Sequence, residues 1–361
     1  MSRWRSTWPV IDGDDKLALW LPRVRAADWV SLDTEADSLH AYPEKLCLIQ
    51  ISLPGVDQLV DPLASLDLMP LLDALRGREL ILHGADYDLR MLRRTYGFVP
   101  KAIFDTMLAA RLLGFTEFGL TNLVERLLSV RLEKGPQTAD WARRPLTDRM
   151  IRYARNDTHY LNPLAELLRA RVNAEGRLAW LQESCARLVQ ECAQSRPADP
   201  DQLWRVKGAD KLDRRGLAVL RELWNWRDTE ARATNRPPYF ILPHEILIAL
   251  ADAAAKAKAV APLLPPRFSA RRRDGLLTAV EHALNLPAAQ LPHRNRPSGQ
   301  RPSSAEKRRQ ELLRERRDRR AAELRIDPTL IASRATLSAL ARDWDQHQGT
   351  LMNWQRELLR D

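Results

Sequence analysis

Short apolar runs alternate with stretches of helical periodicity along the first half of the chain. The runs are bounded by polar or turn-forming residues and predict strands at 29–33, 46–51, 58–60 and 80–83. Tyr42-Pro43 and Pro54-Gly55 separate the first three runs and predict an antiparallel meander. Helical periodicity occurs at 69–75 and 86–94, and it predominates from residue 105 onward. This order predicts an α/β domain in which helices flank a mixed sheet.

The helical half of the chain contains an internal duplication. A shift of 90 residues places 227–251 on 317–341 with nine identities in 25 positions. Pro238 then falls on Pro328, so both copies have a helix-breaking residue at the same point. Two copies are too few for a solenoid and suit a pair of small helical domains.

Three domains account for the length of 361 residues, which by itself suits two or three. Proline-rich polar segments at 195–200 and 287–304 mark the boundaries between them. We predict an α/β domain at 1–196, a helical domain at 204–285 and a second helical domain at 300–361.

Net charge separates the two halves of the chain. Residues 1–199 contain 26 basic and 27 acidic side chains, whereas residues 200–361 contain 31 and 20. The overall charge of +10 therefore resides in the helical half. An excess of this size favours binding of a polyanion, although arginine-rich helices are also common as solvated surfaces.

Composition excludes several classes of protein. Hydrophobic residues make up 45% of the chain and charged residues 29%, which is typical of a globular protein. No apolar run reaches the roughly 18 residues of a membrane span, and the first residues lack the apolar core of a signal peptide. Three cysteines without C-x-x-C spacing fit neither a disulfide framework nor a structural zinc site. We expect a cytoplasmic protein that does not bind membranes.

Acidic residues recur where predicted strands end and predicted helices begin. Asp33 and Glu35 stand two apart at the end of a strand, so their side chains project from one face. Asp88 follows a strand-to-helix junction, and Tyr153 and Asp157 lie four apart on one face of a helix. Each pattern alone is common, and an isolated D-x-E is usually a solvated strand end.

Together these residues provide four carboxylates and one phenol. Mg²⁺ and Mn²⁺ take oxygen ligands, and carboxylates supply the compensating negative charge. Two such ions about 4 Å apart stabilise the attacking and leaving oxygens of an in-line phosphoryl displacement. The set therefore indicates phosphoryl transfer with two metal ions. Asp86, at the same junction as Asp88, is expected to cap the helix, and a continuous helix is predicted at 147–171.

Four segments resemble the ribonuclease D family in sequence, order and spacing. They are 32–50 with its D-x-E and L-C-L-I-Q stretches, 83–89 (H-G-A-D-Y-D-L), 140–146 (D-W-A-R-R-P-L) and 153–157 (Y-A-R-N-D). The two helical domains resemble HRDC domains, small bundles that the family shares with some helicases. The resemblance implies a ribonuclease-H-like exonuclease fold for the first domain. Ala36 departs from the family, in which an aromatic residue commonly follows D-x-E.

The resemblance also implies roles for individual residues. The metal ligands would be Asp33, Glu35, Asp88 and Asp157. They would hold two divalent metal ions, either Mg²⁺ or Mn²⁺. Tyr153 would orient the water that attacks the last phosphodiester of the RNA, which is the tyrosine form of the family's third motif.

Three further polar positions are not assigned to the chemistry. His83 at the end of a strand is expected to be structural, and Asp105 is expected to cap the helix that follows it. The D-W-x-R-R segment at 140–144 fits either an ordered loop or a contact with phosphate.

The chain is therefore expected to be a metal-dependent 3′→5′ exoribonuclease. Its substrate would be RNA with a free 3′ end, such as tRNA precursors and other structured RNAs, and its product nucleoside 5′-monophosphates. A 3′→5′ DNA exonuclease is an alternative, because no residue identifies a 2′-hydroxyl contact. A catalytically silent nucleic-acid-binding adaptor would have no use for mutually repulsive carboxylates. No G-x-x-x-x-G-K-[S/T] loop is present, which disfavours a helicase, and no obligate protein partner is indicated.

Overall fold

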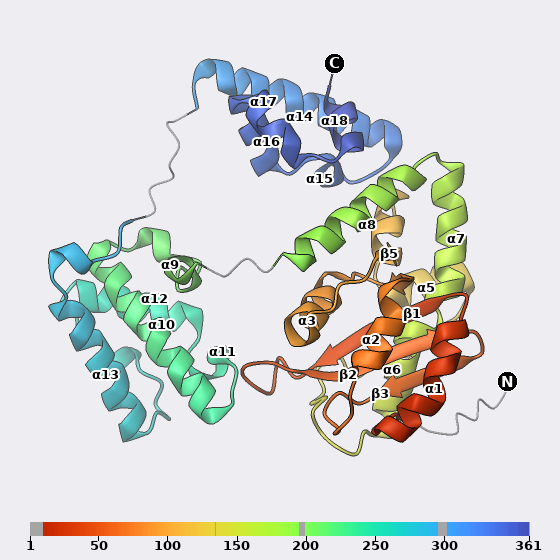
Figure 1. Cartoon of the computed structure of the whole chain (residues 1–361). Coiled ribbons are helices and arrows are strands. Elements are labelled where there is room, and N and C mark those ends of the chain that lie inside the picture. Colours follow the sequence, from red (N-terminus) through yellow and green to blue (C-terminus); the bar gives the residue numbers. More distant parts are fainter. Residues whose placement is uncertain (1–9, 134, 195–198, 295–301, 361) are drawn as a thin grey trace. The chain divides into compact units, whose positions relative to one another are not determined.

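A five-stranded mixed sheet forms the centre of the first domain in the computed structural model, which describes residues 10–133, 135–194, 199–294 and 302–360 (Figure 1). Its strands are β1 (Val30–Ala36), β2 (Leu46–Leu53), β3 (Val56–Val60), β4 (Glu79–Leu82) and β5 (Ala102–Asp105). They lie in the order β3-β2-β1-β4-β5. The pairs β1–β2 and β2–β3 are antiparallel, and β1–β4 and β4–β5 are parallel. The predicted meander and mixed sheet are confirmed.

Helices cover both faces of this sheet. Leu48 of β2 belongs to the apolar cluster beneath α6, and its neighbour Ile49 belongs to the larger cluster on the opposite face. The helices of the domain are α1 (Asp14–Ala26), α2 (Met69–Arg76), α3 (Asp86–Tyr96), α4 (Thr106–Leu112), α5 (Leu120–Leu128), α6 (Asp148–His159), α7 (Leu161–Ala174) and α8 (Leu178–Ala193). Because both faces are covered, every residue of β2 is buried.

Three local features differ from the sequence prediction. The pattern does not predict β5, a four-residue strand beside β4 at the edge of the sheet, nor α1, which has Pro22 in its interior. The helix predicted at 147–171 is two helices, α6 and α7. A continuous helix would press the ring of Pro163 against the carbonyl group of His159, so the helix breaks at Tyr160.

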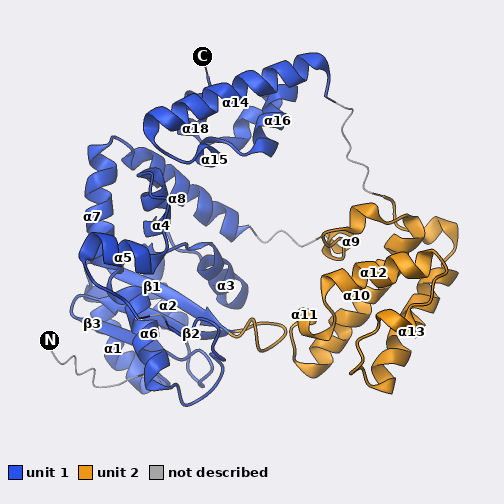
Figure 2. Ribbon diagram, turned by 180° about the vertical axis from the view of Figure 1, so that it is seen from behind, with its two compact units in different colours: residues 1–36, 46–195, 300–361 blue, residues 37–45, 196–299 orange. Residues whose placement is uncertain are grey.

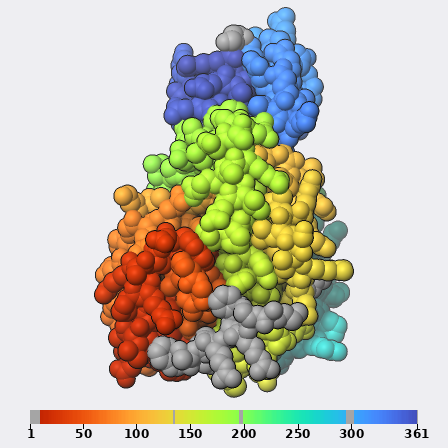
Figure 3. All heavy atoms as spheres, turned by 90° about the vertical axis from the view of Figure 1, so that its right-hand side faces the viewer, coloured from red at the N-terminus to blue at the C-terminus, as the bar shows by residue number. Residues whose placement is uncertain are grey.

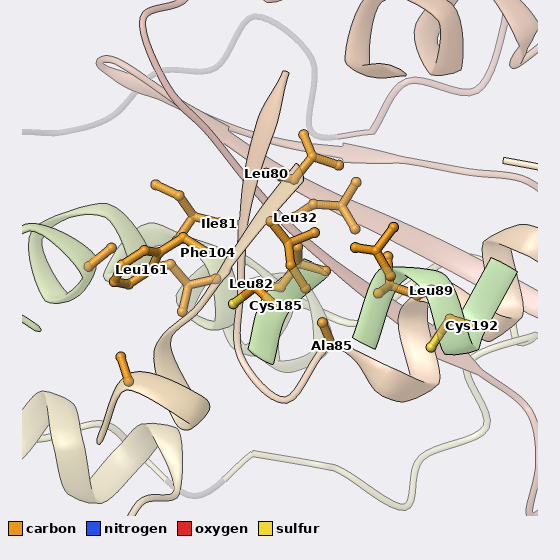
Figure 4. Close-up of a cluster of buried hydrophobic side chains, with 14 of the residues drawn as sticks. Leu32, Leu80, Ile81, Leu82, Ala85, Leu89, Phe104, Leu161, Cys185 and Cys192 are labelled. Carbon is orange, nitrogen blue, oxygen red and sulfur yellow. The ribbon is translucent and has the colours of Figure 1, made fainter. Parts of the chain in front are cut away.

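The larger apolar cluster joins residues that are far apart in sequence. Leu32 of β1 and Leu82 of β4 meet Leu89 of α3 and Cys185 of α8 (Figure 4). Since α3 begins soon after β4 ends, this packing fixes the first turn of α3 beside the end of β1.

The chain divides into two compact units (Figure 2). Unit 1 comprises residues 1–36, 46–195 and 300–361, and unit 2 comprises residues 37–45 and 196–299. The helices of unit 2 are α9 (Pro200–Leu203), α10 (Arg214–Thr234), α11 (Pro238–Ile241), α12 (His244–Ala255) and α13 (Ala270–Asn285). They enclose a separate apolar core. The predicted boundary at 195–200 lies mostly outside the described residues, and the predicted domain limits stay a prediction.

The duplication in the sequence recurs in the helix bounds. The C-terminal helices are α14 (Ser304–Leu324), α15 (Pro328–Ile331), α16 (Arg334–Arg342), α17 (Trp344–His347) and α18 (Asn353–Leu359). α14 and α15 match α10 and α11 in length at an offset of 90 residues. Both copies contain the same hydrogen bond: Arg227 donates to the Leu242 carbonyl oxygen at 3.0 Å, and Arg317 donates to that of Ala332 at 3.0 Å.

The C-terminal helices share a core with the exonuclease domain within unit 1. Trp354 of α18 stacks on Trp180 of α8, with ring centroids 5.0 Å apart and 14° between the planes. Arg177 donates hydrogen bonds to the carbonyl oxygens of Leu112 and Leu324, at 2.6 and 2.9 Å. In the space-filling view the blue C-terminal atoms lie directly on the green segment that includes α7 and α8 (Figure 3).

Trp354→Ala is expected to destabilise the whole of unit 1 by about 3–5 kcal/mol, because Trp354 is 3% exposed and its stacking partner belongs to the exonuclease domain. Denaturant unfolding followed by circular dichroism measures the effect. Tyr239→Ala is the matched control, because that aromatic side chain is 59% exposed. Equal unfolding midpoints for both variants would contradict a shared core.

Candidate active site

Three carboxylates converge beside the end of β1. Asp33 and Glu35 project from one face of β1, and Asp157 reaches them from α6, which packs on that face. One ligand oxygen from each lies within 4.8 Å of the other two. The predicted spacing of the D-x-E motif and the helical position of Asp157 thus bring together groups that are more than 120 residues apart in sequence.

Asp88 lies beside this cluster. It is the third residue of α3, is 5% exposed, and accepts a hydrogen bond of 2.5 Å from the Thr34 hydroxyl group. Burial is the first cause of the raised pKa values of Asp33 and Glu35, and the charge of Asp88 raises both further, so the four predicted carboxylates interact electrostatically. Asp86 lies outside it and pairs with Arg90 at 2.9 Å on the surface.

The prediction that Asp86 caps α3 is wrong. The N-cap residue is Ala85, and the Asp105 carboxylate accepts hydrogen bonds from the backbone N–H groups of Gly84 and Ala85 at 3.0 and 2.9 Å. Asp105 also caps α4, as predicted, by accepting from Met107 and Leu108. One carboxylate therefore fixes the starts of two helices, and the first of these contains Asp88.

Burial and mutual repulsion hold the four carboxyl groups in their protonated forms more strongly than in water. Loss of solvation, with the neighbouring charges, raises the pKa of Glu35 to about 9 and that of Asp33 well above its ordinary value. Loss of solvation also raises the pKa values of Asp88 and Asp157 to about 7. A cation would remove this penalty, and an all-oxygen donor set suits a hard divalent ion. The residues present therefore fit the metal site implied by the sequence.

Tyr153 lies one turn before Asp157 on α6. Burial, followed by the charge of Asp157, raises the pKa of its phenol, so the phenol keeps its proton at neutral pH. A hydrogen bond from this side chain lowers the pKa of Asp157. The Trp141 ring lies 6.0 Å from the Tyr153 ring, and a Cβ atom at Gly135 would overlap that ring. The loop before α6 therefore confines the phenol beside Asp157.

The positions left unassigned by the sequence have partners within the exonuclease domain. The His83 ring pairs with the Thr106 hydroxyl group at 2.9 Å. Arg144 forms an ion pair with Asp61 at 2.5 Å and donates to the Cys47 carbonyl oxygen at 2.7 Å. Arg144 thus orders the loop, whereas a phosphate contact by the exposed Arg143 stays a prediction. Sequence reasoning missed Thr34 and the second role of Asp105, since each acts on a residue more than 15 positions away.

Comparison with known proteins extends this assignment. A family model described as 3′-5′ exonuclease matches residues 9–173, and one described as HRDC domain matches 216–258. Ribonuclease D of Desulfotalea psychrophila is 32% identical over 351 residues, covering 92% of this chain and 91% of the relative. Ribonuclease D of Granulibacter bethesdensis is 32% identical over 372 residues, covering 98% and 92%.

The chain belongs to the ribonuclease D family. It also superimposes on the crystal structure of Escherichia coli RNase D, an exoribonuclease involved in structured RNA processing, with a TM-score of 0.75 and 26% identity over 99% of this chain and 98% of that one. This ribonuclease D-like chain is a 3′-5′ exoribonuclease and hence a hydrolase. The predicted fold class is confirmed: a ribonuclease-H-like exonuclease domain precedes a helical region that contains an HRDC domain. Within the described ranges, no helix of this ribonuclease D-family chain combines the length and apolarity needed to cross a membrane.

Without divalent cations, the stability of this ribonuclease D-family fold is expected to fall as the pH rises. The pKa values of Glu35, Asp88 and Asp157 in the folded state exceed those of the unfolded chain, so the folded state holds more protons. The stability that these protons supply is complete below about pH 4 and is lost as the pH rises through about 7 and then about 9. The melting temperature in EDTA between about pH 5 and about pH 9 measures the loss.

Two variants make this measurement specific. Asp33→Asn removes one of the repelling charges and is expected to flatten the decrease, whereas Asp86→Asn leaves the cluster intact and should follow the wild type. Added Mg²⁺ is expected to flatten it as well. If the melting temperature fell equally steeply with pH in both variants, the carboxylate cluster would not be the origin of the pH dependence.

Proposed function

We propose that this enzyme hydrolyses RNA from the 3′ end and releases nucleoside 5′-monophosphates with the help of two divalent cations, Mg²⁺ or Mn²⁺. The ligands would be Asp33, Glu35, Asp88 and Asp157. The observation that carries the proposal is the convergence of Asp33, Glu35 and Asp157 within 4.8 Å, with the charge of Asp88 acting on two of them, because a bound cation offsets the repulsion that remains when these groups are ionised.

The residues of the chain have separate parts in this reaction. Bound divalent cations would supply Lewis acidity and a water of lowered pKa. Tyr153 keeps its proton, hydrogen bonds with Asp157, and has an oxygen lone pair that can accept from the attacking water and so orient it. The water gives up a proton to solvent and its oxygen bonds to phosphorus as the bond to the preceding 3′ oxygen breaks, and that oxygen takes up a proton from solvent. The shortened RNA thus keeps a 3′-hydroxyl group, and the phosphate leaves on the terminal nucleotide.

The helical region supports an RNA substrate. Its excess of basic residues suits contacts with phosphates that tolerate any sequence, and such contacts would keep a 3′ end close to the carboxylates. Precursors of tRNA and other structured RNAs are the substrates we propose, by analogy with the structured-RNA processing of the Escherichia coli protein. Processing of such RNAs would take place in the cytoplasm.

Asp88→Asn is expected to lower the rate of hydrolysis by more than about a hundredfold, because it removes one carboxylate from the set of four. Its RNA affinity should stay close to that of the wild type, since most phosphate contacts would lie elsewhere. Asp86→Asn is the matched control on the same turn of α3 and should retain full activity. The rate of hydrolysis is measured from the ladder of a 5′-labelled RNA on a denaturing gel. The RNA affinity is measured by filter binding.

The same gel separates the candidate functions when Mg²⁺, Mn²⁺ or EDTA is supplied. A ladder that shortens RNA from its 3′ end with either metal, but not in EDTA, supports the proposal. Faster shortening of the matching DNA would assign the enzyme to DNA. RNA binding without shortening under any metal would leave a nucleic-acid-binding adaptor.

Neutralising the exposed basic residues of unit 2 is expected to weaken RNA binding and its salt dependence. Lys207, Arg236 and Arg267 are exposed, and a triple change to Gln removes up to three phosphate contacts. Each lost contact lowers the slope of log Kd against log salt by about 0.7 for single strands. Lys256→Gln is the control, because Lys256 already pairs with Asp252 at 2.7 Å. An unchanged slope in the triple variant would show that these residues of unit 2 do not contact the phosphates of the RNA.

A further inference from the structure

Gln50 lies directly opposite Asp33 in the sheet. β1 and β2 pair antiparallel with Asp33 facing Gln50 and Ser31 facing Ser52. Residues that face each other across antiparallel strands have side chains on the same face, with Cβ atoms about 4.5–5.5 Å apart. The Gln50 side chain therefore begins beside Asp33, on the face that α6 covers.

Gln50 is fully buried, and neither polar atom of its side chain has a hydrogen-bond partner among the described residues. The hydroxyl group of Ser31, two residues before Asp33 on the same face, is buried and unpartnered in the same way. Such groups are rare in folded proteins, because burying them without a partner costs stability. Because both groups lie on the Asp33 face, they are candidates to form hydrogen bonds with the Asp33 carboxylate.

Neighbouring polar residues of the same hairpin are satisfied. Ser52 lies on the same face, and its hydroxyl group contacts Asp57 at 2.6 Å and Thr158 at 2.8 Å. Gln58 of β3 is also buried and donates to the Leu59 carbonyl oxygen at 3.2 Å. Gln58 faces Ile51 and so projects from the other side of the sheet. Among the polar side chains of β1, β2 and β3, the buried atoms without a hydrogen-bond partner are therefore those of Ser31 and Gln50, on the Asp33 face.

We propose that Gln50, assisted by Ser31, is a positioning residue for Asp33. When Asp33 is ionised around a divalent cation, the Gln50 amide and the Ser31 hydroxyl donate hydrogen bonds to it from the side of the sheet and hold one oxygen toward the cation. This proposal rests on the proposed metal site. Donors behind a metal ligand commonly fix its orientation, and their loss weakens metal affinity by about 10–100-fold.

The test uses full-length protein and Mn²⁺ alone, titrated by calorimetry without RNA. Gln50→Met keeps the length and shape of the side chain and removes both polar atoms. Its affinity for Mn²⁺ is expected to fall about 10–100-fold, while its melting temperature in EDTA stays equal to that of the wild type or rises. High Mn²⁺ should restore its rate of RNA hydrolysis by mass action, as it would not for Asp33→Asn.

Two further variants complete the test. Ser31→Ala removes a single oxygen and is expected to shift Mn²⁺ affinity in the same direction by a smaller factor; it decides the question if Gln50→Met does not fold. Gln58→Met is the control on the other face and should bind Mn²⁺ like the wild type.

The outcomes separate this role from the metal site itself. If Asp33→Asn loses Mn²⁺ binding while Gln50→Met and Ser31→Ala stay within twofold of the wild type, the positioning role is overturned and the metal site stands. If Asp33→Asn binds Mn²⁺ like the wild type, the metal site is overturned together with the role of Gln50. An affinity loss in Gln58→Met equal to that in Gln50→Met would also overturn the role.

Discussion

Repulsion among four buried carboxyl groups is the constraint on which the rest of the exonuclease domain depends. Asp33 and Glu35 come from one strand, Asp157 from α6, and Asp88 from the start of α3. Loss of solvation is the largest cause of the raised pKa of each group, and charges of other members of the set further raise the pKa values of Asp33, Glu35 and Asp157. The surrounding fold therefore holds together groups that repel one another whenever they ionise.

The supports of this cluster are hydrogen bonds and packing that lie one layer behind it. Asp105, at the end of β5, holds the backbone before α3, and the Thr34 hydroxyl group holds Asp88. Tyr153 is confined by the loop that Arg144 and Asp61 order. Because strands, helices and one ordered loop supply these supports, the fold itself holds the carboxylates close together.

Local periodicity was enough to predict much of this site. Strand alternation places Asp33 and Glu35 on one face, and helical spacing places Tyr153 and Asp157 on one side of a helix. Pairing across the sheet was not accessible in that way. The facing of Gln50 and Asp33 depends on the register of a hairpin whose strands are joined by nine residues, 37–45, and alternation alone does not determine that register. The cap of α3 was missed for a similar reason, because Asp105 reaches it from another strand.

The two copies of the helical module have different surroundings. In the C-terminal copy, Leu330 of α15 packs against the core of unit 1, and Trp354 stacks on α8. The position that matches Leu330 in the first copy is Phe240, which is 60% exposed. The same surface is thus used for stability in one copy and left open to solvent in the other. An open aromatic surface in a basic module suits the proposed RNA contacts, since bases stack on aromatic rings without regard to sequence.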